Sequence, residues 1–154
     1  MEEQPITYFA PDRALYTEKR HAVTCVHKLD FHLVISTKYR RPVLVGDVGQ
    51  LVRDLIVQKA AELETWLLGV AVQPEHVHIL IGLKPTQSVA EIVGQTKGVT
   101  SFQAFKQFPD LLEAIGEPKL WSGGYFASSV GKTNVAQNIA YLQRQHEHHA
   151  LPDD

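Results

Sequence analysis

The sequence has a single cysteine, Cys25, among its 154 residues. One cysteine excludes an internal disulfide and a metal site built from several thiolates, and such usage is typical of a reducing cytoplasm. The sequence also lacks an uninterrupted apolar stretch of the ~20 residues that a membrane helix requires. Its first residues, Met1 to Pro5, lack the basic and then apolar pattern of an export signal. We therefore expect a cytoplasmic protein that is neither exported nor embedded in a membrane.

An excess of positive charge is also missing. Fifteen Lys and Arg residues stand against 17 Asp and Glu, which gives a formal net charge of −2. A protein that binds any nucleic acid by counterion release alone would be strongly basic. Any DNA contact must then come from local patches, of which the densest is Lys38, Arg40 and Arg41. Lys97 and Lys132 are isolated further candidates, and the simpler interpretation of any one of these charges is a solvated surface residue.

Apolar residues are present in the amount that a packed domain requires. They make up 44% of the chain, which is enough to bury the core of one domain of this length. Residues 1–20 carry two prolines and mixed charges, and their apolar residues do not recur at a regular spacing. We expect them to form an N-terminal extension with little structure of its own, followed by a single domain over residues 21–150.

The spacing of apolar residues predicts alternating strands and helices from residue 22 onward. In order, the pattern predicts a long strand at 22–37, a helix at 47–66, a strand hairpin at 67–73 and 76–83, a helical region at about 89–105 that Gly98 can interrupt, a loop at 109–124, a strand at 125–130 and a helix at about 133–149. This is the βαββαβ order of a ferredoxin-like α+β sandwich with an antiparallel sheet, plus one C-terminal helix. Two helices would cover one sheet face and leave the other for the last helix or a second subunit.

Two histidines lie two residues apart on the third predicted strand, where His76 and His78 flank Val77. Successive side chains of a strand alternate between its faces, so both imidazoles point to the same side, toward the open face of the sheet. This spacing suits two ligands of one cation. A chain with eight histidines can also contain the pattern by chance, and His146-Glu147-His148 is a second example. The pair alone does not establish a metal site.

The last predicted helix adds a phenol and an amide. Val135, Ile139 and Leu142 recur at the spacing of an apolar stripe. Tyr141 and Gln145 lie one turn apart on a flank of that stripe. A tyrosine can attack a phosphodiester that a nearby cation polarises, and an amide oxygen can bind that cation. In the alternative interpretation the tyrosine packs at the edge of the core and the glutamine is an ordinary surface residue.

Five motifs follow one another in a fixed order between residues 22 and 149. They are the strand and basic turn FHLVISTKYRRPVL, the hairpin and histidine strand PEHVHILI, the KG of Lys97-Gly98, the strand WSGGYFASSVG and the helix end YLQRQHEHH. Together they resemble the single-tyrosine HUH transposases of the IS200/IS605 insertion-sequence family, in which U stands for a hydrophobic residue. Five ordered motifs are far more specific than one pair of histidines.

The resemblance implies a transposase that nicks and rejoins single-stranded DNA. Tyr141 would be the nucleophile, leaving a 5′-phosphotyrosine link and a free 3′-OH, so that rejoining requires no ATP. His76 and His78 would bind Mg²⁺ or Mn²⁺, with Gln145 as the third protein ligand. The enzyme would recognise hairpins at the ends of an insertion sequence. It would act as a homodimer in which the tyrosine helix of one subunit completes the site of the other, and Gly131 offers that helix a flexible joint.

Three alternatives stay open at this point. A relative adapted to host use, such as a REP-associated tyrosine transposase, would perform the same chemistry on another DNA target. A module that keeps the fold could bind hairpins without cutting them. A metal-dependent hydrolase, with water as the attacking group and Tyr141 as a structural residue, would cut DNA and leave no protein-linked product.

Overall fold

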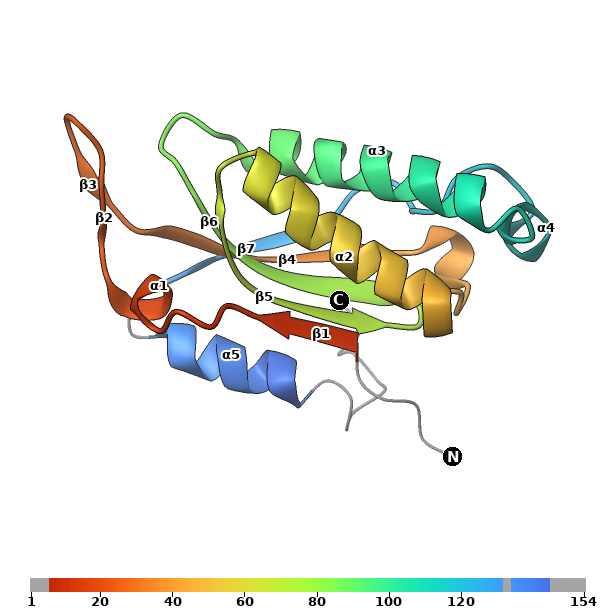
Figure 1. Cartoon of the computed structure of the whole chain (residues 1–154), viewed down its shortest axis with the longest axis horizontal. Helices are drawn as coiled ribbons and strands as arrows, with labels where there is room; N and C mark the ends of the chain where they lie inside the picture. The colour runs from red at the N-terminus through yellow and green to blue at the C-terminus, as the bar shows by residue number, and fades with distance from the viewer. Residues whose placement is uncertain (1–5, 132–133, 145–154) are drawn as a thin grey trace.

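The structure is a computed structural model that describes residues 6–131 and 134–144. An antiparallel five-stranded sheet of order β1-β5-β6-β4-β7 carries helices on both faces (Figure 1). The elements, in chain order, are β1 (Ile6–Phe9), α1 (Ala14–Thr17), β2 (Arg20–His21), β3 (Val26–His27), β4 (Leu29–Ser36), the 3₁₀ helix η1 (Lys38–Arg40), α2 (Gly46–Glu62), β5 (Trp66–Gln73), β6 (His76–Leu83), α3 (Val89–Gln107), α4 (Leu111–Ile115), β7 (Phe126–Val130) and α5 (Val135–Gln143). The layers are α2 and α3 on one face and α1 and α5 on the other.

The predicted ferredoxin-like order is confirmed. It runs through β4, α2, β5, β6, α3 and β7, and α5 is the additional C-terminal helix. The predicted hairpin is β5–β6, in which Gln73 lies opposite His76. Helix α3 begins at an N-cap, because the Ser88 side chain accepts a hydrogen bond from the Glu91 backbone N–H. This helix, α3, continues through Gly98 rather than breaking there.

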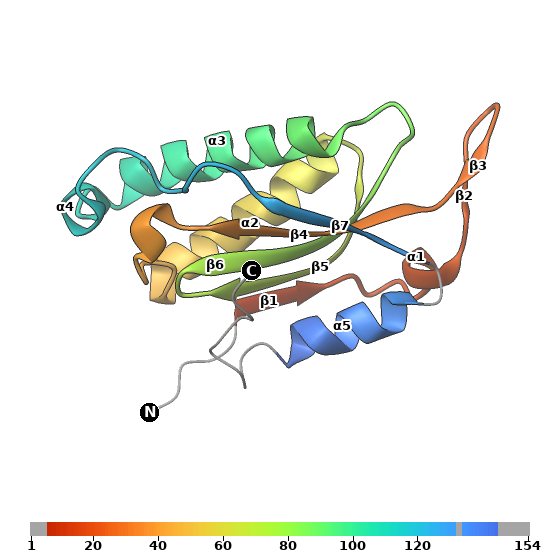
Figure 2. The same cartoon turned by 180° about the vertical axis from the view of Figure 1, so that it is seen from behind.

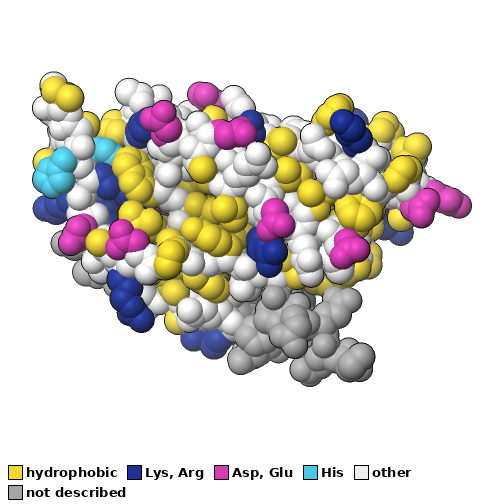
Figure 3. All heavy atoms as spheres, in the orientation of Figure 1, with side chains coloured by type: hydrophobic (Ala, Val, Ile, Leu, Met, Phe, Trp, Pro, Cys, Tyr) yellow, Lys and Arg dark blue, Asp and Glu magenta, His cyan; other side chains and the backbone are white. Residues whose placement is uncertain are grey.

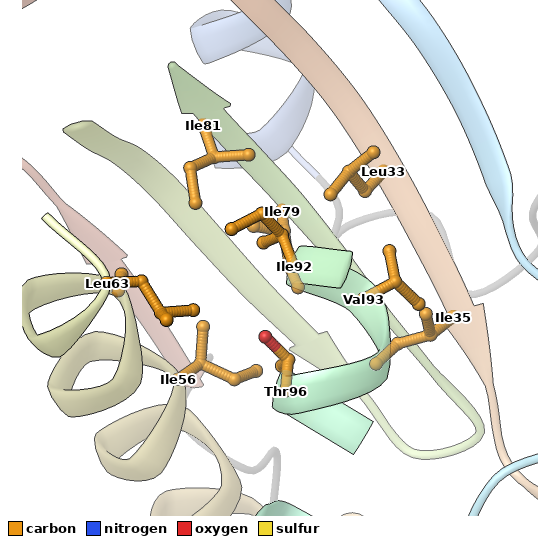
Figure 4. Close-up of a pocket in the computed structure, with 10 residues that line it drawn as sticks. Leu33, Ile35, Ile56, Leu63, Ile79, Ile81, Ile92, Val93 and Thr96 are labelled. Carbon is orange, nitrogen blue, oxygen red and sulfur yellow. The ribbon is translucent and has the colours of Figure 1, made fainter. Parts of the chain in front are cut away.

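The larger hydrophobic core lies between the sheet and the pair α2–α3. Inward-facing aliphatic residues of β4, β5 and β6 pack there against Ile56, Ile92 and Val93. Figure 4 shows side chains of β4, β6, α2 and α3 that line a pocket in this core. The cavity measures about 10 Å³. This volume is about that of one water molecule, and the lining is aliphatic apart from Thr96. The cavity therefore belongs to the core and is too small for a ligand.

A smaller core lies on the opposite face, beneath α5. Its buried members come from three strands and from the helix: Leu68, Ala71, Leu80, Val130, Val135 and Leu142. Ile139 is half-buried against them, so the apolar stripe expected on the last helix is the face that packs on the sheet. This places the last helix on the face that the βαββαβ order leaves open.

Part of the N-terminal extension is structured, so the expectation of little structure over residues 1–20 is wrong for the part described. Strand β1 pairs antiparallel with β5, with Ile6 opposite Val72 and Phe9 opposite Gly69. Helix α1 follows it. A strand of four residues is too short for its apolar and polar residues to alternate recognisably in the sequence, and its structure depends on hydrogen bonds to a distant strand.

The long strand expected at 22–37 is divided. Its first part belongs to the β2–β3 hairpin, which projects from one end of the molecule (Figure 2), and its second part is β4. The exposed Cys25 lies in the connection of that hairpin. Helix α2 ends at Glu62 rather than near Trp66, because Glu64 adopts a left-handed conformation with φ 57°. The expected loop at 109–124 contains the short helix α4.

Candidate active site

Strand β6 carries both histidines of the H-x-H pattern on the face beneath α5. His78 lies opposite Val34 of β4 and Ala71 of β5, so it occupies the middle of the sheet. Both imidazoles are 1% exposed, and their ring centroids are 5.1 Å apart. The alternation of the strand thus brings the two rings together, as the spacing predicts.

Helix α5 brings Tyr141 to this pair. The tyrosine ring lies edge-on to the His78 ring, with centroids 5.7 Å apart. It also lies edge-on to the His32 ring, at 6.0 Å. The contact is made within one chain, because α5 packs on its own sheet through Val135 and Leu142. The tyrosine and the two histidines, which come from distant parts of the sequence, therefore meet at one place.

His32 is a site residue that the sequence interpretation missed. Its Nε2 lies 2.9 Å from Nδ1 of His78, at hydrogen-bond distance, and the two rings are stacked. His32 shares the polar parity of its strand, and β4 is the direct neighbour of β6. The register between the two strands was the missing information, since His32 pairs with Leu80 and reaches His78 diagonally.

Three nitrogens of the H-x-H pair have no hydrogen-bond partner among the residues that the structure describes: Nδ1 and Nε2 of His76 and Nε2 of His78. Glu75 Oε1 lies 3.2 Å from His76 Nδ1, but without hydrogen-bond geometry. A buried polar atom without a partner costs about 1–3 kcal/mol. Two buried imidazoles side by side, with nitrogens that lack a partner among the described residues, fit a cation, which would supply the missing interaction.

Burial keeps both imidazoles neutral at physiological pH. Desolvation lowers the pKa of His76 to about 4, with a smaller contribution from the positive charge of Arg40. Desolvation also lowers the pKa of His78 to about 3, helped by His32 and His76. A neutral imidazole is the form that binds a metal ion, so at neutral pH no proton competes with the cation.

The basic turn, Lys38–Arg41, lies next to this site, because Thr37 before the turn donates its backbone N–H to the carbonyl of Glu75, the neighbour of His76, at 2.9 Å. Two of its residues, Tyr39 and Arg40, have left-handed φ angles of 58° and 52°, a conformation that is costly for residues with a Cβ. Hydrogen bonds hold the turn in this shape: Thr37 Oγ1 donates to the Arg41 carbonyl at 2.8 Å, and Tyr39 donates to Glu117 at 2.6 Å. Arg40 and Arg41 are exposed.

Lys97 has an internal role. Its ammonium donates to the carbonyls of Ser122 and Gly124, at 2.9 and 2.6 Å, which fastens α3 to the segment before β7. Desolvation lowers its pKa. Figure 3 shows Lys and Arg side chains interspersed with Asp and Glu on the face in view, as the net charge of −2 leads one to expect. The assignment of Lys97 to DNA binding stays a prediction.

Two of the predicted site residues, Lys132 and Gln145, lie outside the described residues, and so do His146, His148 and His149. Within the described part of the chain, no group of three or more His, Cys, Asp or Glu side chains is arranged to hold a metal ion. The structure thus brings His76 and His78 together, and their role as metal ligands, like that of Gln145, remains a prediction.

Comparisons with known proteins identify the family. Residues 25–145 match the family model described as "Transposase IS200 like". The chain belongs to the IS200-like transposase family. This transposase is 32% identical over 122 residues to the ISDra2 transposase TnpA of Deinococcus radiodurans, which covers 79% of this chain and 87% of that protein. It is 31% identical to the transposase for insertion sequence element IS200 of Salmonella typhimurium, over 76% of each chain.

Solved structures agree with the fold of this transposase. A crystal structure of a putative transposase from D. radiodurans superposes with a TM-score of 0.69 at 31% identity, covering 82% of this chain and 98% of the other. A REP-associated tyrosine transposase bound to a REP hairpin superposes with a TM-score of 0.54 at 13% identity, covering 85% of this chain and 76% of the other, and shows the fold alone. The resemblance seen in the five sequence motifs is thereby confirmed, and the protein is a DNA transposase.

The family places the protein among DNA-binding, DNA-cutting enzymes that generally depend on a metal ion. Its members serve insertion sequences, as the names of the Salmonella relatives state. No helix in residues 6–131 and 134–144 is long and apolar enough to cross a membrane.

Proposed function

We propose that this transposase cuts and rejoins single-stranded DNA through a covalent bond between Tyr141 and a 5′-phosphate. The observation that carries the proposal is the contact of the Tyr141 ring with the His78 ring, at 5.7 Å. The Tyr141 ring lies edge-on to a buried histidine whose Nε2 lacks a partner among the described residues. The arrangement is the one that a tyrosine nucleophile beside a metal-bound phosphate requires.

The proposed step conserves atoms and energy. The Tyr141 hydroxyl oxygen bonds to phosphorus, and the bond from phosphorus to the 3′ oxygen of the preceding nucleotide breaks. The phenolic proton is released, and the departing 3′ oxygen gains one to become a free 3′-OH. One phosphodiester replaces another, so the reverse reaction with a new 3′-OH rejoins DNA without ATP.

The proposed ligands are His76 and His78, with Gln145 as the third, for Mg²⁺ or Mn²⁺. When bound, the cation would polarise the phosphate and neutralise its charge. His32 orients the site in this proposal: His78 donates its Nδ1–H to His32 Nε2, which leaves the lone pair of His78 Nε2 for the cation. A hydrogen bond of this kind fixes both the tautomer and the rotation of the ring.

The proposed DNA contacts begin at the basic turn. Arg40 and Arg41 are exposed beside the histidine site, where they would bind phosphates flanking the cut. Lys38, Lys97 and Lys132 are further candidates. We propose that a hairpin at the end of the insertion sequence is the recognised feature, which the hairpin bound to a distant structural neighbour supports by analogy. A homodimer is also part of the proposal, and the exposed edge strand β7, where Phe126 is 44% exposed, offers a surface for a second copy.

The test is covalent capture of DNA. The protein is incubated with labelled single-stranded DNA from both flanks of its own gene in the presence of Mn²⁺, and the products are separated under denaturing conditions. We expect a protein–DNA band in the wild type that is absent in Tyr141→Phe. Tyr125→Phe is the matched control, because Tyr125 is an exposed tyrosine outside the proposed site, and it should keep the band.

Other outcomes would point to other functions. Cut DNA without a linked protein would favour water as the attacking group and assign Tyr141 a structural role. Tight binding of a folded hairpin with every strand intact would favour a non-cutting module. Adduct formation with dispersed genomic repeats, in preference to the gene's own flanks, would favour a transposase adapted to host use.

A further inference from the structure

The basic turn, Lys38–Arg41, holds an aromatic side chain in the open. Tyr39 is 58% exposed. Figures 1 and 2 both show the 3₁₀ helix η1 of this turn, drawn orange between β4 and α2, at the end of the sheet where α4 lies. Strand β4 ends just before it at Ser36, which lies opposite His76. An exposed ring therefore lies on a basic turn that adjoins the histidine site.

The backbone of the turn is strained at the residues that form it. Tyr39 and Arg40 have φ angles of 58° and 52°, and the Arg41 N–H donates to the Lys38 carbonyl at 3.2 Å. Positive φ at both central residues is the mark of a type I′ turn, in which Asn and Gly are the usual residues because they tolerate it. Backbone strain of this kind is concentrated at functional sites. The turn therefore carries two large side chains where the backbone alone favours small residues.

A hydrogen bond holds the Tyr39 ring in place. Its hydroxyl donates to Glu117 Oε2 at 2.6 Å, and this bond raises the pKa of the phenol, which therefore stays a donor at neutral pH. The other carboxylate oxygen of Glu117 lies 3.8 Å from the Lys38 ammonium. A ring that is already held at its hydroxyl end loses little conformational entropy when a flat partner binds to it. Tyr39 is thus both exposed and preorganised.

Cations surround this ring. Lys38 Nζ lies 5.1 Å from the ring centroid and Arg41 Cζ lies 6.0 Å from it, and Arg40 is exposed on the same turn. Proteins that bind single-stranded nucleic acid combine aromatic rings, on which bases stack, with basic side chains that follow the phosphates. One ring and three cations in four consecutive residues therefore fit a nucleotide with its flanking phosphates.

We propose that Tyr39 is a stacking platform for an unpaired nucleobase beside the cut, with phosphates on either side of that base held by Lys38, Arg40 and Arg41. This rests on the proposed function and adds a reason for the choice of single strands. The faces of a paired base are covered by its neighbours in the duplex, whereas an unpaired base can turn out onto a ring. The ring selects single strands, because the cations alone would accept the phosphates of any DNA.

Binding of two labelled strands separates the base from the phosphate. One is a single strand of thymidylates, and the other is a strand of the same length built from abasic nucleotides. Affinities are measured by fluorescence anisotropy without metal. Tyr39→Leu should weaken binding of the thymidylate strand on the order of 10-fold, the contribution of a stacked base, and should change binding of the abasic strand by less than about twofold. Equal losses on both strands, or no loss on either, would overturn the proposal.

Two further variants separate the ring from the shape of the turn. Tyr39→Gly removes the ring and supplies a residue that adopts φ 58° without strain, so it should lose the same base-dependent affinity as Tyr39→Leu. Tyr39→Phe keeps the ring and lacks only the hydrogen bond to Glu117, so its affinity should stay within about threefold of the wild type. Full affinity in Tyr39→Gly would overturn the proposal, because the loss in Tyr39→Leu would then come from strain.

Phe102→Leu is the matched control on the thymidylate strand. Phe102 is 65% exposed, with the Lys106 ammonium 6.0 Å from its ring centroid, so it is a second exposed ring beside a cation. It lies on α3, which covers the sheet face opposite the histidine site. Binding should be unchanged in this variant. A loss equal to that of Tyr39→Leu would overturn the proposal, because exposed rings would then bind bases wherever they lie.

Covalent capture links the platform to the proposed function. Abasic nucleotides are placed one at a time along the flank DNA that the wild type captures. At one position next to the cut, loss of the base should reduce adduct formation about 10-fold in the wild type and less than about twofold in Tyr39→Leu. The same dependence on every base in both proteins would overturn the platform while the proposed function stood. A wild type that forms no adduct, but binds thymidylates through Tyr39, would count against the proposed function alone.

Discussion

His32 Nε2 and His78 Nδ1 lie 2.9 Å apart across the boundary between β4 and β6. One of these nitrogens must carry the proton that they share, and a donor at His78 Nδ1 leaves His78 Nε2 as an acceptor with a free lone pair. The hydrogen bond from His32 on β4 therefore determines whether Nε2 of His78 is available to a cation.

His32→Ala should weaken binding of Mn²⁺ by about 10- to 100-fold, the usual effect of removing a hydrogen-bond partner of a ligating histidine. Titration calorimetry with Mn²⁺ in the absence of DNA measures this without depending on cleavage. Ser128→Ala is the control, because Ser128 lies opposite His32 on β7 and is exposed. Equal Mn²⁺ affinity in His32→Ala and the wild type would show that the contact does not orient the ligand.

The metal-free protein should lose stability as the pH falls below about 6.5. His76 and His78 have pKa values of about 4 and about 3 when folded, against about 6.5 when unfolded. Between these values the unfolded state binds more protons, so the free energy of unfolding falls with falling pH by up to about 1.4 kcal/mol per pH unit for each histidine. Above pH 6.5 both histidines are neutral in the folded and the unfolded state, so their contribution to the free energy of unfolding no longer changes with pH.

Denaturant unfolding at a series of pH values measures this slope. His78→Leu supplies the comparison, since leucine fills a similar volume without a titratable group. We expect a shallower slope, because leucine removes one of the two histidines whose pKa is lowered by folding. An unchanged slope in His78→Leu would mean that this imidazole does not titrate differently in the two states.

Arg40→Gln should weaken binding of single-stranded DNA and lower the salt dependence, with the slope of log K against log salt falling by about 0.7. Arg40 is exposed next to His76, where a phosphate would approach the site. Fluorescence anisotropy over a salt series gives the slope. Arg53→Gln is the matched control, because Arg53 lies on α2, on the opposite side of the sheet. Equal salt slopes for the two variants would show that the basic turn is not part of the DNA interface.

Asp30→Asn should destabilise the fold by about 3–5 kcal/mol, because it leaves Arg20 and Lys28 without their buried anion. The carboxylate is fully buried between the two cations. Thermal and denaturant unfolding report the loss. Asp54→Asn, which removes an exposed pair with Arg53, should cost no more than about 1 kcal/mol. Similar losses in the two variants would mean that the buried network adds little.

The sequence was sufficient to predict the βαββαβ core, because each of its strands and helices is long enough to show its period. The hairpin of β5 and β6 and the pairing of His76 with His78 on one face follow from alternation alone. The open face was also predicted, but the sequence left it to the last helix or a second subunit, and the structure places α5 there. Local periodicity thus located His76, His78 and Tyr141, the residues to which the proposal assigns metal binding and attack.

Features that depend on pairing between distant residues could not be predicted in the same way. Strand β1 has four residues and exists through hydrogen bonds to β5. His32 became a site residue only through the register of β4 against β6. The first predicted strand is interrupted, and α2 ends early, because of local backbone angles such as φ 57° at Glu64. The spacing of apolar side chains does not reveal such angles.

The two hydrophobic cores lie on opposite faces of one sheet, and only the smaller one adjoins the reactive side chains. Most of the aliphatic packing is between the sheet and α2–α3. A lineage could therefore lose the nucleophile, or exchange the histidines for apolar residues, while the rest of the domain stayed folded and kept its basic turn. The residues that stabilise the fold are largely different from the residues proposed to react with DNA. A descendant of such a transposase that has lost transposition could therefore stay folded and acquire a new DNA-binding role.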